Sequence, residues 1–176
     1  MAFTDADLIA RVLLREDQNA FGELVRRYQS PVRGFLMKMT NGDTHLADDL
    51  AQEAFLKAWK KLGSFRSESK FSTWLFGIAH NEWRMNVRGR KEIALADIAD
   101  QPPEAEQPDD AAASHLRLDL TEAMKTLTPA ERAAIVLCCQ NGLSHDEAAQ
   151  ALDCPLGTVK TNVLRGKEKL RRRLAI

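Results

Sequence analysis

A row of cations follows two threonines near the C-terminus, in a pattern suited to reading duplex DNA. Val159, Val163, Leu170 and Leu174 share one side of a helix predicted over 158–174. The other side is then free, and its candidate base-reading residues are Thr158, Lys160, Thr161, Leu164, Arg165 and Lys167. The first turns of such a helix reach base edges in the major groove, where arginine pairs with guanine. From residue 160 onward seven bases accompany one acid, which predicts salt-dependent contacts with phosphates.

A second pattern, over residues 64–91, alternates aromatic rings with cations. Unpaired bases need a ring or an apolar pocket for stacking and cations along their backbone. The residues expected to bind such a strand are Ser64, Phe65, Arg66, Lys70, Trp74, Asn81, Arg84 and Arg88. The alternative is that Phe71, Trp74 and Trp83 mainly fill the core, as single aromatic residues at helical spacing usually do. The polar, cationic loop 64–70 lies between two apolar segments and favours a pocket for an extruded base.

Residues that could support catalysis or bind a metal are few. His45 with Asp48, Asp49 and Glu53 is the one candidate cluster, and only Asp49 and Glu53 share a helix face. The chain has neither a histidine pair on one helix nor two cysteine pairs at zinc spacing. We therefore expect no catalytic residue, no metal and no cofactor. The three cysteines, Cys138, Cys139 and Cys154, are expected to be reduced thiols that act as small buried apolar residues.

Apolar spacing predicts an all-α fold. In the first half, apolar residues recur at three-and-four spacing over 8–28, and Pro31 is expected to restart the pattern. Asn41-Gly42-Asp43 marks a turn, after which Asp43 or Thr44 caps the next helix. The inward stripe of that helix is Leu46, Leu50, Ala54, Ala58 and Leu62. A further helix is predicted over 71–91.

The second half has stronger helix signals. A helix over 116–127 is followed by Thr128-Pro129-Ala130-Glu131, which combines a capping hydroxyl, proline at the first position and glutamate at the third. That helix is expected to stop at Asn141-Gly142. Helices over 144–152 and 158–174, joined by a short break, then form a helix-turn-helix.

Charge divides the 176 residues into three parts, although Lys plus Arg and Asp plus Glu are 25 each. Residues 1–93 have 15 bases and 12 acids, 94–115 have six acids and no base, and 116–176 have 10 bases and 7 acids. The middle stretch also has three of the six prolines, which predicts a linker between domains at 1–93 and 116–176. The alternative is an ordered acidic loop packed on one domain. No apolar run approaches the length of a membrane span and no export signal is evident, so we expect a cytoplasmic protein without membrane insertion.

Several of these segments resemble a known family. The stretches DDLAQEAFLKAW at 48–59, FSTWL at 71–75 and IAHN at 78–81 resemble region two of bacterial sigma factors. The stretches LTPAER at 127–132, GLS at 142–144 and PLGTVKT at 155–161 resemble region four. Two regions in this order, with only a short linker, resemble the extracytoplasmic-function (ECF) group of the sigma-70 class. The resemblance implies binding to core RNA polymerase, promoter recognition and help with DNA melting.

The resemblance also implies roles for particular residues. Those on the helix that docks to the polymerase clamp would be Asp49, Gln52, Glu53, Phe55 and Trp59. The loop 64–70 with Asn81 and Arg84 would bind the non-template strand of the minus-ten element. Lys160, Thr161, Leu164 and Arg165 would contact the minus-thirty-five element, and the acidic linker would thread toward the polymerase channels. An anti-sigma factor is a further expected partner, since nothing in the sequence looks self-inhibitory.

A competing interpretation is an ordinary transcription regulator. Its first domain would sense a signal or dimerise, and its helix-turn-helix would bind operators as a dimer without polymerase. The sigma interpretation instead predicts a monomer that binds DNA weakly alone, because two small domains on a linker are not preorganised.

Overall fold

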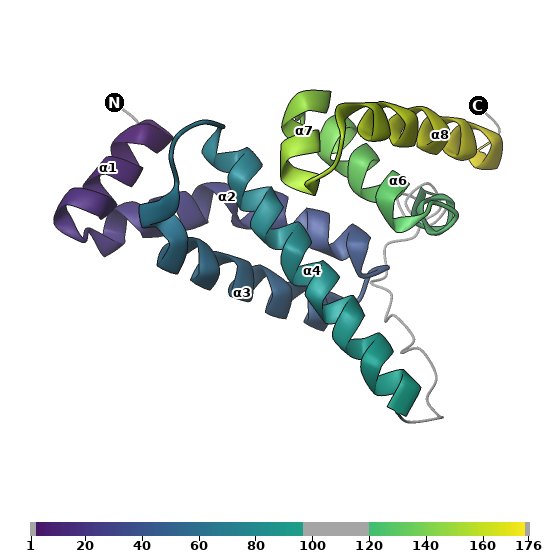
Figure 1. Ribbon diagram of the computed structural model, residues 1–176, viewed down its shortest axis with the longest axis horizontal. Coiled ribbons are helices and arrows are strands. Elements are labelled where there is room, and N and C mark those ends of the chain that lie inside the picture. The colour runs from purple at the N-terminus through teal and green to yellow at the C-terminus, as the bar shows by residue number, and fades with distance from the viewer. Residues whose placement is uncertain (1–2, 97–119, 175–176) are drawn as a thin grey trace, which may run out of the picture.

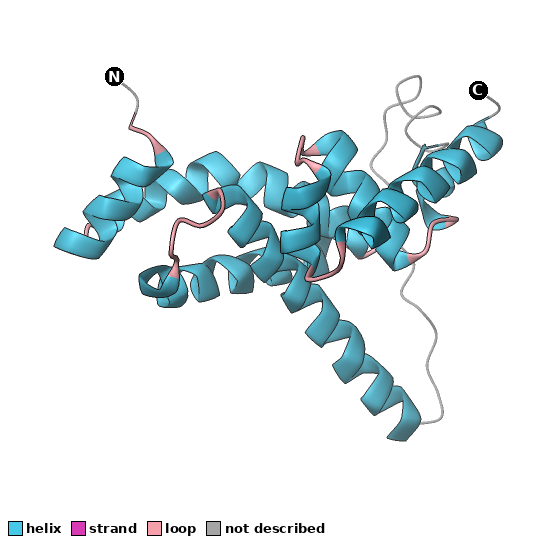
Figure 2. Ribbon diagram, turned by 45° about the horizontal axis from the view of Figure 1, so that its top comes forward, coloured by secondary structure: helices cyan, strands magenta, loops and turns pink. Residues whose placement is uncertain are grey.

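The computed structural model describes residues 3–96 and 120–174 (Figure 1). Within these ranges the regular structure is helical and contains no strand, which confirms the all-α prediction (Figure 2). The N-terminal module has α1 (Asp5–Arg15), α2 (Gln18–Met39), α3 (Thr44–Lys61), a short turn η1 (Leu62–Ser64) and α4 (Phe71–Ala96). The C-terminal module has helical residues 120–125, α6 (Pro129–Ile135), a π-helical turn η2 (Val136–Gln140), α7 (His145–Leu152) and α8 (Leu156–Leu174).

Most of the predicted linker lies outside the described residues. Its first three residues, 94–96, are instead the end of α4, which continues beyond the predicted end at residue 91. The predicted helix over 116–127 is described only from residue 120, where it is helical to residue 125.

The expected interruption at Pro31 is wrong, because α2 runs through it. A proline inside a helix has no N–H for the preceding turn and clashes with it, at a cost of about 3 kcal/mol. Leu24, Val32 and Phe35 lie on both sides of Pro31 and are fully buried. Burial of these side chains on one continuous face stabilises the helix enough to offset the defect.

The core of the N-terminal module lies where α3 packs against both α2 and α4. Leu50, Ala54, Ala58 and Leu62 of the predicted stripe are buried, and Leu46 packs against the core from its edge. Ala47 and Ala51 are also buried on this side, so most of the inward surface of α3 consists of methyl groups. Such small side chains allow neighbouring helices to approach closely.

Local signals determine most helix ends in the C-terminal module. Thr128 and Glu131 form the predicted capping box at α6, and Ser144 and Glu147 form a second one at α7. Gly142, with φ of +69°, follows η2 and confirms the predicted glycine stop. Sequence did not predict η2 itself, in which the Asn141 amide donates to the Val136 carbonyl at 3.0 Å, five residues back.

Gly166 of α8 is buried against α6. A Cβ at this position would lie 2.7 Å from Cγ1 of Ile135, well inside van der Waals contact. Glycine therefore allows α8 to approach α6 more closely than alanine would. Val163 and Val159, one and two turns earlier on the same side, are buried as predicted.

The prediction that the three cysteines are reduced and buried is wrong in part. All three thiols are free, but Cys139 is exposed and Cys138 and Cys154 are only half-buried. The turn η2 carries Cys139 outward at the end of the α6 segment. Among the described helices, none has the length and apolar character needed to cross a membrane.

The close contact at Gly166 yields a stability prediction. Replacing Gly166 by alanine is expected to lower the free energy of unfolding by about 1 to 2 kcal/mol, because the clash with Ile135 exceeds the helix-propensity gain. Gly89→Ala in α4 is the matched control, since its Cβ would meet nothing within 4 Å. The control should gain about 0.5 to 1 kcal/mol. Urea unfolding of both variants measures the difference, and equal stabilities would contradict the close approach.

Candidate functional site

One side of α8 is fully accessible. Thr158, Lys160, Thr161, Arg165 and Lys167 are all exposed, and Leu164 among them is 61% exposed. These six residues, the α8 face, are the candidate base-reading set, and the fold brings them together on the side opposite Val159 and Val163. An exposed leucine among cations suits contact with a thymine methyl.

The orientation of α8 is fixed by a buried carboxylate. Glu131 is 4% exposed, accepts from the Thr128 amide at 2.9 Å and pairs with Lys169 Nζ at 2.7 Å. Burial alone would raise the pKa of Glu131, but Lys169 and Thr128 outweigh it and the pKa is lowered. One residue thus caps α6 and ties it to α8.

Aromatic rings gather where the loop 65–70 meets α4. The Phe65 ring lies 5.2 Å from Trp74 and 5.9 Å from Phe71, measured between centroids. Phe71 is 3% exposed and also contacts Tyr28, so it is a core residue. Phe65 and Trp74 are half-buried. The core alternative is therefore right for Phe71, while Phe65 and Trp74 keep part of their surface available.

Trp74, Asn81 and Arg84 line an open pocket of about 380 Å³ on α4. Its opposite wall comes from Gln150 and Asp153, at the end of α7. The remaining candidates are accessible nearby in the chain: Ser64, Arg66, Lys70 and Arg88 are exposed. Together these residues could stack an unpaired base and neutralise the phosphates of its strand. We call them the α4 surface, which comprises Phe65, Arg66, Lys70, Trp74, Asn81, Arg84 and Arg88.

His80, a wall of this pocket, is largely buried. Its ring stacks on Trp83 at 5.8 Å and meets the edge of Phe35 at 6.4 Å. Burial, and next the positive charge of Arg84, lower the pKa of His80 to about 4. The imidazole is therefore neutral at physiological pH and adds no positive charge to the α4 surface.

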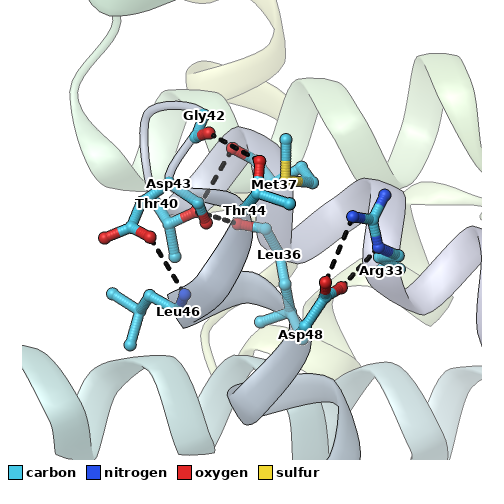
Figure 3. A network of polar contacts seen from close by, with 9 residues as sticks. All are labelled: Arg33, Leu36, Met37, Thr40, Gly42, Asp43, Thr44, Leu46 and Asp48. Carbon is cyan, nitrogen blue, oxygen red and sulfur yellow. Dashed lines mark hydrogen bonds and ion pairs between the residues drawn. The ribbon is translucent and has the colours of Figure 1, made fainter. Parts of the chain in front are cut away.

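The start of α3 is set by a tight turn after α2 (Figure 3). Gly42, at φ of +93°, donates its amide to the Met37 carbonyl at 2.9 Å. Asp43 then caps α3 by accepting from the Leu46 amide at 2.9 Å, which selects Asp43 over Thr44 as the cap. The exposed Arg33 guanidinium pairs with Asp48 and lowers the pKa of that carboxyl.

The outward side of α3 is a mixed acidic and apolar strip. Asp49, Gln52 and Glu53 are exposed, and Trp59 is 37% exposed although its ring edge contacts Phe21. Phe55 departs from this group, because it is half-buried against the core.

Leu56, which sequence analysis missed, is 44% exposed on this side. Leu56 is three residues after Glu53 and four after Gln52, and this spacing could have placed it on the same helix face as those two residues. We call Asp49, Gln52, Glu53, Leu56 and Trp59 the α3 face.

A partly buried ion pair joins α3 to α4. Lys57 Nζ lies 2.6 Å from Glu82 Oε2, and the Glu82 side chain is 8% exposed. Glu82 follows Asn81 directly, and Lys57 follows Leu56. The α3 face and the α4 surface are therefore held in a fixed relation by charge as well as packing.

Comparison with known proteins identifies these elements. Residues 24–93 match the family model for sigma-70 region 2, and residues 117–170 match that for sigma-70 region 4. The RNA polymerase sigma-H factor of Pseudomonas aeruginosa is 33% identical, over 94% of this chain and 91% of the relative. The ECF RNA polymerase sigma-E factor of Haemophilus influenzae is 32% identical, over 97% and 95%. A solved structure of the sigma factor RpoE with the anti-sigma factor NepR, from Bartonella quintana, aligns with a TM-score of 0.77 at 29% identity, covering 89% of this chain and 97% of that one.

The chain belongs to the sigma-70 family of RNA polymerase sigma factors. Its two matched regions, and its similarity to an ECF sigma-E factor over almost the whole length of both chains, place it within the ECF group. A separate dimeric regulator is not favoured, because residues 24–93 of the N-terminal module match sigma-70 region 2.

The burial of His80 predicts a pH dependence of stability. Its folded pKa lies below the ordinary value of 6.5, so the unfolded chain binds this proton first as pH falls. His80 therefore makes stability decline between pH 6.5 and 4, by about 3 kcal/mol in all. His80→Phe keeps the ring and should flatten that part of the curve, measured by urea unfolding across pH.

The exposed His45 supplies the control for this measurement, as His45→Phe removes a surface imidazole. The same decline in the wild-type protein and in His80→Phe would mean that other groups cause the acid sensitivity.

Proposed function

We propose that this sigma factor docks on core RNA polymerase through the α3 face and recognises promoter DNA through the α4 surface and the α8 face. The observation that carries the proposal is that three chemically distinct sets of side chains are accessible, on α3, on α8, and on α4 with the loop before it. One set is acidic and apolar, one aromatic and cationic, and one cationic at a helix start.

The α8 face is proposed to read the minus-thirty-five element in duplex form. A recognition helix that enters the major groove uses residues of its first turns, and Thr158, Thr161 and Arg165 lie one turn apart in that part of α8. The cations from residue 167 onward would contact phosphates, which position the helix without reading sequence.

The α4 surface is proposed to hold the minus-ten element as a single strand. Trp74 offers a ring, Asn81 an amide that can both donate and accept, and Arg84 a cation, all around one pocket. A duplex hides these base faces, so binding here would stabilise melted DNA.

The α3 face is proposed to dock on core RNA polymerase. The carboxylates of the α3 face would pair with a basic surface on the partner. Leu56 and Trp59 would supply the apolar contact of the interface. The protein would act in the cytoplasm as an initiation factor without a catalytic site of its own. An anti-sigma factor is proposed as a second partner, in line with the complex reported for the similar RpoE.

Run-off transcription tests the whole proposal. Core RNA polymerase with the purified chain should start at defined promoters that core polymerase alone ignores. Failure to select any start site across a genomic promoter library would refute the proposed function.

Arg165→Ala tests base readout by the α8 face. We expect a loss of about 1 to 3 kcal/mol confined to one base pair of the minus-thirty-five element, with polymerase binding intact. Arg172→Ala, at the far end of α8, is the control and should weaken all sequences alike. Holoenzyme binding to a set of single-base promoter variants distinguishes the two patterns; a uniform loss for Arg165→Ala would make it a phosphate contact.

Glu53→Arg tests the docking face. Reversing an exposed charge should leave the fold intact and weaken binding to core polymerase about tenfold or more, because like charges then meet at the interface. Glu92→Arg, an equally exposed reversal near the end of α4, should bind normally. Surface plasmon resonance with immobilised core enzyme compares them, and equal affinities would remove Glu53 from the interface.

A further inference from the structure

Met85 of α4 is an exposed apolar residue that lies outside the buried apolar cluster. Its side chain is 53% exposed, and it is the one exposed large apolar group among the described side chains of α4. A single exposed apolar side chain is common on protein surfaces and by itself indicates nothing. The position of Met85 relative to the pocket on α4 gives it significance.

Met85 lies on the same stripe of α4 as two residues of that pocket. It follows Trp74 by eleven residues and Asn81 by four, and both spacings return to nearly the same side of a helix. The Asn81 amide donates a weak hydrogen bond to Met85 Sδ, with Nδ2 and Sδ 3.7 Å apart. Asn81 lines the pocket, and Met85 stands one turn beyond it.

The spacing places Met85 where paired DNA would begin. A helix rises 1.5 Å per residue, so Met85 lies about 6 Å beyond Asn81 along the axis. Stacked bases of one strand are about 3.4 Å apart. Met85 is therefore within about two base steps of a base held in the pocket, close to the first base pair that remains closed.

Duplex DNA can approach this part of α4. The last turns of the helix extend past the other helices in both views (Figures 1 and 2). Arg88, which is exposed three residues after Met85, supplies a cation for a phosphate of the flanking duplex. The side chain of Met85 is thus an apolar group beside a cation, on a helix that no other described element covers at its far end.

We propose that Met85 is an apolar wedge, which inserts between bases where the duplex ends and the melted strand begins. An inserted apolar side chain replaces part of the stacking that two bases lose when they separate. Methionine is unbranched and flexible, so it can fit between bases of any sequence. This inference rests on the proposed role of the α4 surface. That surface holds an extruded base, and Met85 keeps the neighbouring step from closing again.

The test separates opening of the duplex from binding of the opened strand. Met85→Gln keeps the length of the side chain and an acceptor for Asn81, but removes the apolar surface. Met85→Leu keeps that surface. Leu14→Gln, at a side chain on α1 that is 83% exposed, is the control for loss of an exposed apolar group. Both positions are exposed, so all three variants should fold.

Run-off transcription with core polymerase compares a duplex promoter that the wild type uses with the same promoter carrying a mismatched, already open minus-ten segment. Met85→Gln should lower transcription from the duplex about tenfold or more and reach the wild-type level on the open template. Met85→Leu and Leu14→Gln should match the wild type on both templates. An equal loss by Met85→Gln on both templates, or a loss on neither, would overturn the wedge.

The base analogue 2-aminopurine, placed at successive positions of the minus-ten element, locates the insertion. Its fluorescence rises when stacking is lost. The wild-type holoenzyme should therefore give a rise at the duplex end of the melted segment, and Met85→Gln should reduce the rise most strongly there. A reduction spread evenly over all positions would contradict a local wedge.

The wild-type reactions distinguish failure of the wedge from failure of the proposed function. A wild-type chain that selects a start site, while Met85→Gln behaves identically, upholds the proposed function and refutes the wedge. A wild-type chain that selects no start site even on open templates refutes both.

Discussion

A buried guanidinium is one of the groups that join the two modules. Arg132 donates to the carbonyls of Met124 and Leu127 within its own module and to Lys38 and Asn41 of the other. Burial lowers the pKa of Arg132, yet arginine stays charged because its ordinary value is so high. A buried charge needs every partner, since an unpaired donor in this environment costs far more than the bond contributes. The helix-turn-helix is therefore anchored at a point that also determines where it lies relative to α2.

The accessible sets on α3 and α4 are coupled by interactions that touch neither DNA nor polymerase. The Lys57–Glu82 pair crosses from one helix to the other, and Phe35 and Phe76 pack edge to face at 5.7 Å between α2 and α4. A movement of α3 on docking would thus carry α4 with it. If α3 docks on polymerase as proposed, this arrangement would connect that docking to the pocket on α4.

The features that the sequence predicted correctly are those that depend on neighbouring residues in the chain. The caps at Asp43 and Thr128, and the buried stripe of α3, follow from residues within a turn or two of each other. The predicted interruption at Pro31 was wrong, because α2 is kept continuous by burial of its apolar side chains against other helices, which the local sequence does not show. The role of Arg132 was equally hidden, since its partners Asn41 and Lys38 are 91 and 94 residues away.

The alanines at positions 47, 51, 54 and 58 set the position of α3 without taking part in recognition. These positions are buried between helices, so a larger side chain there would overpack the core and push α3 outward. Sequence drift at these interior sites would therefore alter the fit to a partner as surely as a change among the exposed residues. The position of the α3 face thus depends on the buried alanines behind it. If this face docks on polymerase as proposed, compatibility with polymerase would also constrain these alanines, which polymerase would not contact.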